Sequence, residues 1–78
     1  MYDEYIDDPE GFSLLVSRFM DRYSIGPVEL AKKSNVSRST IYKVRKGIDC
    51  YASIKNRILK GMWIHFEEVK HHYMTGSS

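Results

Sequence analysis

Side chains that can form hydrogen bonds or carry positive charge gather in residues 37–46, SRSTIYKVRK. An arginine can donate two hydrogen bonds to a guanine edge, and serine and tyrosine hydroxyls can either donate or accept. Ile41 and Val44 stand three residues apart and predict one apolar side of a helix. The polar side chains then share the opposite side, where we expect them to face a ligand.

The candidate contacts fall into two chemical groups, because base contacts specify a sequence whereas phosphate contacts position the protein on the duplex. The expected base contacts are Ser37, Arg38, Ser39, Tyr42 and Lys43. The expected phosphate contacts are Lys32, Lys33, Thr40, Arg45 and Lys46. For Lys32 and Lys33 an alternative is equally open, since cations near the C-terminal end of a helix also complement its dipole.

Two short helices joined by a tight turn must position these residues, in a motif that spans 27–46. Pro27 suits the first position of the first helix, where its missing N–H costs little. Asn35 tolerates the left-handed backbone that a sharp turn requires, and Ser37 can cap the second helix. Gly47 is placed to end that helix.

The motif resembles the phage-repressor and Cro-like helix-turn-helix family, also called the XRE family. The matching residues are Leu30-Ala31, Asn35-Val36-Ser37, Ser39-Thr40-Ile41, Val44 and Gly47, with Phe66-Glu67-Glu68-Val69 similar to the family's closing turn. The chain departs from the family at Pro27, where glutamine is common, and at Arg45-Lys46, where an acidic residue is common. The resemblance implies an all-α, lambda-repressor-like domain of four to five helices.

The same resemblance implies a function and partners. A homodimer would bind a double-stranded DNA operator, with one second helix of the motif in the major groove of each half-site. Dimerisation would use the C-terminal region, where we expect an interface formed by Met62, Trp63, Ile64 and Phe66. The expected setting is the cytoplasm of a bacterial cell, with the protein at the nucleoid when bound, and a phage or mobile-element origin.

Charge is unevenly distributed along the chain, although the net charge is only +2. Residues 32–60 carry nine basic side chains against Asp49 alone, whereas residues 1–8 carry four acidic side chains and no basic one. A basic block centred on such a motif is typical of nucleic-acid binding, although a solvated basic face gives the same pattern. Residues 1–8 are expected to form a flexible arm that solubilises the protein, covers the basic face or docks a protein partner.

Further helices are predicted on both sides of the motif, within a single domain that spans 9–73. Asp8-Pro9 marks the start of a helix that ends near Tyr23, with an apolar stripe formed by Phe12, Leu15, Val16, Phe19 and Tyr23. A helix over 51–60 is expected to turn Ile54, Ile58 and Leu59 inward and Lys55, Arg57 and Lys60 outward. Gly61 either interrupts it or permits a close helix approach. A last helix is expected over 65–73, followed by a disordered tail over 74–78.

Catalysis and metal binding are not indicated by any motif. The run HFEEVKHH places Val69, not histidine, four residues after His65, so the zinc-protease spacing is missing. We therefore expect no catalytic residue, cofactor or metal. The lone Cys50 cannot form an internal disulfide, and no apolar run approaches the ~20 residues that a membrane helix requires.

One alternative belongs to a different class of function. A helix-turn-helix scaffold can act mainly through protein contact, as an antirepressor, an antitoxin or an inhibitor. The acidic arm and the apolar cluster around Trp63 would then be its working surfaces.

Overall fold

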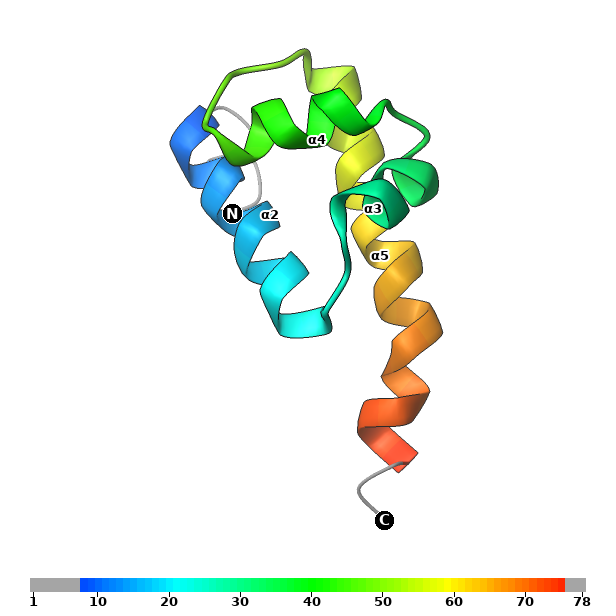
Figure 1. The fold of residues 1–78 in the computed structure, drawn as a ribbon. Helices are drawn as coiled ribbons and strands as arrows, with labels where there is room; N and C mark the ends of the chain where they lie inside the picture. The colour runs from blue at the N-terminus through cyan, green and yellow to red at the C-terminus, as the bar shows by residue number, and fades with distance from the viewer. Residues whose placement is uncertain (1–7, 76–78) are drawn as a thin grey trace.

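Four helices make up the regular structure in the part of the chain that the structure describes (Figure 1). This computed structural model describes the backbone of residues 8–75 and the side chains of residues 8–70. The helices are α2 (Pro9–Tyr23), α3 (Pro27–Ser34), α4 (Arg38–Arg45) and α5 (Ala52–Thr75). The expected all-α class is therefore confirmed. Residues 1–7, which make up nearly all of the expected arm, lie outside this description, as do residues 76–78.

Helix α2 begins and ends close to the predicted residues. The Asp8 carboxylate accepts a hydrogen bond from the backbone N–H of Glu10 at 3.2 Å, and Pro9 follows at the first helical position. Ser24 ends the helix in the left-handed conformation with φ 53°. These local signals place a capped helix where its apolar stripe can face the rest of the chain.

The turn between α3 and α4 also has the predicted geometry. Asn35 adopts the left-handed conformation with φ 57°, and its N–H is directed at the last carbonyls of α3. The next N–H, that of Val36, donates to the Ala31 carbonyl oxygen at 3.1 Å. The chain therefore changes direction within three residues, and α4 starts directly after Ser37.

Helix α5 corrects the prediction of two separate C-terminal helices. It runs without interruption from Ala52 to Thr75, through Gly61 and through the segment 61–64 that was expected to separate two helices. Met74 and Thr75, which the sequence placed in a disordered tail, are part of this helix. In Figure 1 its distal part extends beyond the other three helices.

Gly61 permits a close approach of α3 and α5 rather than a break, which was the second of the two expectations for this residue. A Cβ atom at Gly61 would lie 2.7 Å from the backbone nitrogen of Ser34 and 2.8 Å from its Cα atom. Both distances are shorter than van der Waals contact allows. The absence of a side chain at Gly61 is therefore what lets the two helices cross.

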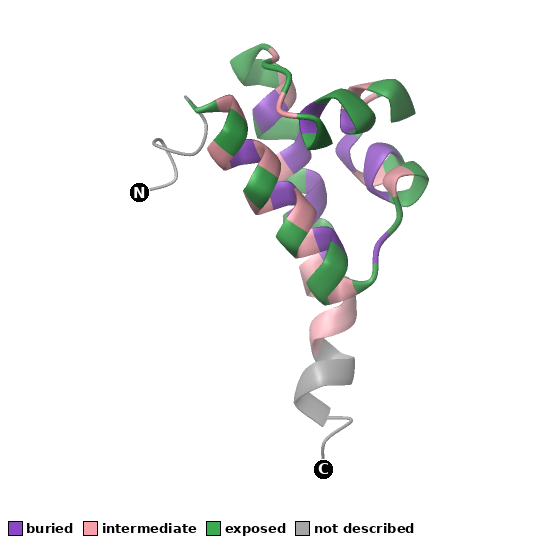
Figure 2. Cartoon of the chain, turned by 60° about the vertical axis from the view of Figure 1, so that its left-hand side comes forward, coloured by how far each residue is buried: buried purple, intermediate pink, exposed green. Residues whose placement is uncertain are grey.

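The core lies where the four helices meet, on their inward faces (Figure 2). The inward face of α2 contributes Phe12, Val16 and Met20, while α3 contributes Leu30 and Ala31. Helix α4 adds Ile41 and Val44, and α5 adds Ile58 and Met62. The motif helices are thus fixed by burial of their apolar sides, which directs their polar sides outward.

Candidate nucleic-acid interface

Helix α4 is anchored on one side and exposed on the other. Ile41 and Val44 are at most 1% exposed. On the opposite side Arg38, Ser39 and Lys43 are exposed to solvent, together with Tyr42, whose exposed fraction is 45%. Four of the five predicted base-contacting residues therefore share the accessible face of one helix, next to Lys46.

The Ser37 hydroxyl is occupied by its role as the N-cap of α4. Its Oγ accepts from the backbone N–H of Thr40 at 3.3 Å and lies 2.8 Å from Thr40 Oγ1 and 3.1 Å from Ser39 Oγ. A hydroxyl has one donor and two acceptor positions, so these three contacts use its full capacity. We therefore assign Ser37 to capping and retain Ser39 as the serine that can contact bases.

The C-terminal end of α4 is closed by a Schellman motif. The Gly47 N–H donates to the Val44 carbonyl at 3.0 Å, and the Ile48 N–H donates to the Lys43 carbonyl at 3.0 Å. Gly47 supplies the positive φ of 85° that this cap requires. The Ser13 hydroxyl of α2 also donates to the Arg45 carbonyl at 2.8 Å, which fixes the end of α4 against α2.

The predicted phosphate contacts differ in their surroundings. Lys32, Arg45 and Lys46 are exposed, and Thr40 is half-buried. By contrast, the Lys33 ammonium lies 3.1 Å from the carboxylates of both Glu29 and Glu68. Lys33 therefore has its charge balanced within the protein, and we do not retain it as a phosphate contact.

Burial by itself lowers the pKa of Lys33, but the hydrogen bonds and charges of its two carboxylate partners outweigh it. The net effect raises the pKa of Lys33 above its ordinary value. Lys33 thus remains an ammonium at neutral pH. It links α3, which carries Glu29, to α5, which carries Glu68.

His65 completes this cluster and was not predicted as a structural residue. It is 5% exposed, with Nε2 3.3 Å from the Tyr23 carbonyl oxygen and Nδ1 2.7 Å from the Lys33 ammonium. A carbonyl only accepts, so Nε2 must carry the proton and Nδ1 must accept from Lys33. His65 therefore connects the ends of α2 and α3 through α5. Its position three and seven residues after Met62 and Ile58 is a signal that could have placed it inward.

The loop after α4 is tied to α5 by Lys55, which the sequence wrongly placed on the outer side. Lys55 is 5% exposed. Its Nζ atom lies 2.8 Å from Asp49 Oδ1 and 5.9 Å from the centre of the Phe12 ring. The hydrogen bond from Lys55, followed by that from the Cys50 N–H, lowers the pKa of Asp49. A long lysine stem can pack along apolar surface and bring its charge to a partner at the edge.

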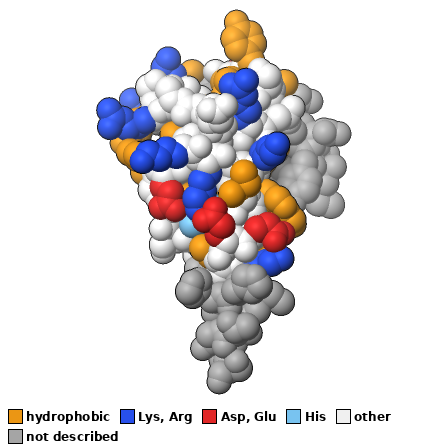
Figure 3. All heavy atoms as spheres, turned by 90° about the vertical axis from the view of Figure 1, so that its right-hand side faces the viewer, with side chains coloured by type: hydrophobic (Ala, Val, Ile, Leu, Met, Phe, Trp, Pro, Cys, Tyr) orange, Lys and Arg blue, Asp and Glu red, His pale blue; other side chains and the backbone are white. Residues whose placement is uncertain are grey.

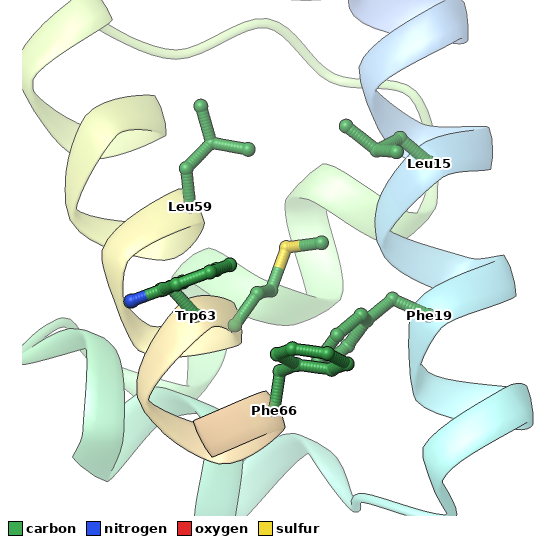
Figure 4. Close-up of a pocket in the computed structure, with 6 residues that line it drawn as sticks. Leu15, Phe19, Leu59, Trp63 and Phe66 are labelled. Atoms are coloured by element: carbon green, nitrogen blue, oxygen red, sulfur yellow. The ribbon is translucent and has the colours of Figure 1, made fainter. Parts of the chain in front are cut away.

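The predicted dimer residues are divided by the structure. Met62, Trp63 and Phe66 line an apolar groove between α2 and α5, of about 560 Å³, together with Leu15, Phe19 and Leu59 (Figure 4). Met62 is 7% exposed and belongs to the core, whereas Trp63 is 61% exposed. Ile64, at 37%, is accessible but does not line the groove.

Most basic side chains are separated from the acidic side chains on one face of the molecule (Figure 3). In Figure 3 most Lys and Arg side chains lie over the upper part of the face, and the Asp and Glu side chains lie below them. In Figure 1 that upper part holds α4 and the start of α5. Within residues 8–70, no three His, Cys, Asp or Glu residues are grouped so that they could hold a metal ion.

No helix in the described range is long and apolar enough to cross a membrane. No protein-family model, curated protein or solved structure matches this chain. The case for a function therefore depends on the arrangement of its own residues.

Proposed function

We propose that this chain is a sequence-specific DNA-binding regulator of transcription, and that α4 enters the major groove. The observation that carries the proposal is that α4 is buried on one side and exposed on the other. Ile41 and Val44 fix its inner side, while Arg38 and the other polar residues project from its outer side, which is exposed to solvent. A major groove is wide enough to admit one such helix.

The residues of α4 have distinct roles in this proposal. Arg38 stands at the first position of the helix, where it can donate two hydrogen bonds to a guanine and discriminate by ~1–3 kcal/mol. Ser39 and Tyr42 contact neighbouring base edges or a thymine methyl group. Lys43 lies one helical turn after Ser39, where it can reach either a base edge or the DNA backbone.

Phosphate contacts flank α4 on both sides. Lys32 approaches the backbone from α3, and Arg45 and Lys46 approach it from the C-terminal end of α4. Thr40 remains a weaker candidate because it is half-buried and its hydroxyl contacts Ser37 at 2.8 Å. This division between a helix that contacts bases and its flanks that contact phosphate corresponds to the Cro-like and lambda-repressor-like arrangement that the sequence resembles.

Two copies would bind a two-fold related operator, with half-sites one helical turn or ~34 Å apart. Trp63 and Ile64 are the exposed members of the predicted dimer interface and the natural contacts between the copies. Such a protein would repress transcription most simply by occluding a promoter, and its own concentration would set the effect.

A DNA titration at several salt concentrations tests the proposal, with duplexes from the chain's own locus and with random duplexes. Specific binding requires an affinity for a local site that exceeds random binding by ~10³-fold or more, together with a steep salt dependence. Arg38→Ala and Lys43→Ala should reduce binding to that site. Arg22→Ala is the control, because it removes the same charge from the end of α2 that lies away from α4 (Figure 1). Equal, weak binding to all duplexes contradicts the proposal.

The apolar groove favours one second candidate, a regulator that acts through a protein partner. An exposed tryptophan beside an apolar hollow is a common anchor of a protein interface. Under this candidate Trp63→Ala abolishes activity, whereas Arg38→Ala and Lys43→Ala leave it unchanged. The two sets of variants therefore separate the two functions.

A further inference from the structure

The groove between α2 and α5 is apolar at its lining and basic at its margins. Its lining is entirely hydrophobic or aromatic. Arg18 and Arg22 are exposed on α2, three residues after Leu15 and Phe19 respectively, so they stand on the same side of that helix as the lining. A ligand for this groove must offer apolar surface together with negative charge.

Helix α5 contributes the same combination to the opposite margin. Lys60 precedes Trp63 by three residues, and Lys70 follows Phe66 by four. Glu67 is the acidic side chain at this margin, and its Oε2 atom lies 2.6 Å from Lys70 Nζ. Four basic side chains therefore border the groove against one acidic side chain, when both helices are counted.

The first seven residues of this chain, MYDEYID, have the complementary composition. Tyr2, Tyr5 and Ile6 supply aromatic and aliphatic side chains. Asp3, Glu4 and Asp7 are the remaining polar positions, and the segment contains no lysine or arginine.

The point of attachment makes the groove reachable. The segment joins the described chain at Asp8, immediately before α2, which supplies Leu15 and Phe19 to the lining. From Asp8 to Phe19 the helix rises by roughly 16 Å, at 1.5 Å per residue. Seven extended residues span up to roughly 23 Å, so a chain that turns back at Asp8 reaches the full length of the lining.

We propose that residues 1–7 occupy the groove of their own chain, with Tyr2, Tyr5 and Ile6 against its lining and the carboxylates toward its basic margins. Attachment in the same chain gives this segment a high effective concentration, which no separate partner has. The segment then covers part of the surface that a second copy would use. It thus raises the protein concentration at which the proposed dimer forms.

Trp63 is the only tryptophan in the chain, so its fluorescence reports on the groove directly. Acrylamide quenching and the emission maximum are measured in the full-length chain without DNA. The triple variant Tyr2→Ser/Tyr5→Ser/Ile6→Ser should quench more readily and emit at longer wavelength. Tyr51→Ser is the matched control, because Tyr51 is 83% exposed and does not line the groove. Equal quenching in the triple variant and the unmodified chain overturns the proposal.

Charge and concentration separate the proposed arrangement from its rivals. The variant Asp3→Asn/Glu4→Gln/Asp7→Asn should also expose Trp63, and added salt should expose it in the unmodified chain. Protection of Trp63 from quenching that does not vary with protein concentration indicates the same-chain contact. Protection that appears only at high concentration, with a dimer mass in sedimentation, shows that a second copy fills the groove and overturns the proposal. Neither measurement depends on DNA binding, so the two proposals fail independently.

Discussion

Gly61 lies against Ser34 where α5 crosses α3, and the space between them does not admit a Cβ atom. We expect Gly61→Ala to destabilise the fold by about 1–3 kcal/mol, because the contact involves backbone that must shift. The sign of this stability change is informative, since a change from glycine to alanine in a helix interior normally stabilises a protein by roughly 0.5–1 kcal/mol. Thermal unfolding followed by circular dichroism measures the change. Asn56→Ala, at an exposed position of the same helix, should stay within ~0.5 kcal/mol of the unmodified chain.

The adjacent residues Lys32 and Lys33 should respond in opposite ways to alanine. Lys32→Ala should leave stability unchanged and reduce the slope of the DNA salt dependence by about 1, since it removes one phosphate contact. Lys33→Ala should cost about 1–3 kcal/mol of stability, because Glu29, Glu68 and His65 lose the group that they share. Urea unfolding and salt-dependent DNA titration are run on both variants. A reduced salt slope in a fully folded Lys33→Ala protein would show that Lys33 contacts DNA after all.

Ser37 and Ser39 provide a second contrast on α4. Ser37→Ala should cost about 1 kcal/mol of folding stability, because it removes the N-cap of the helix. Ser39→Ala should leave stability within ~0.5 kcal/mol and change the preferred base at one operator position. Unfolding curves and binding to a set of singly substituted duplexes distinguish them. A stable Ser37→Ala protein with altered base preference would reverse our assignment of the two hydroxyls.

The Asp49–Lys55 pair should make stability depend on pH on the acidic side. The pKa of Asp49 is lower in the folded chain than its ordinary value. Its contribution is therefore fully present above the unfolded pKa of about 3.9, and is lost as pH falls through the folded value. Asp49→Asn should be less stable than the unmodified chain at neutral pH and equal to it in strong acid.

Lys55→Met is the matched variant for this pair, because it retains the buried stem and removes the charge. It should lose the same part of the acid dependence in urea unfolding measured as a function of pH. If Asp49→Asn and the unmodified chain differ equally at every pH, the ion pair is not the origin of the dependence.

Helices α2, α3 and α4 were predictable because their signals are local. Asp8-Pro9, Asn35, Ser37 and Gly47 act on the backbone within a few residues, and the structure uses each of them as expected. The accessible face of α4 was predictable for a similar reason, since helical periodicity alone separates it from the buried face.

Helix α5 was divided in error because its continuity depends on distant residues. Glycine normally weakens a helix, and only the crossing with Ser34 gives Gly61 its advantage. The roles of Lys33 and Lys55 were missed for the same reason. Their outward charge is typical of surface lysines. Glu29 is a local partner of Lys33, four residues earlier on α3, but Glu68 as a partner of Lys33 and Asp49 as a partner of Lys55 become apparent only when α5 is packed in place.

The buried ammonium of Lys55 also selects one register of α5 among several. Apolar residues recur along its inner face at Ile54, Ile58 and Met62, so a shift by one turn, ~5.4 Å, would still bury hydrophobic side chains. The same shift would carry Lys55 away from Asp49 and leave a charge inside without that partner, at a cost of several kcal/mol. The Lys55–Asp49 contact thereby favours the same alignment of α5 that the crossing of Gly61 and Ser34 requires.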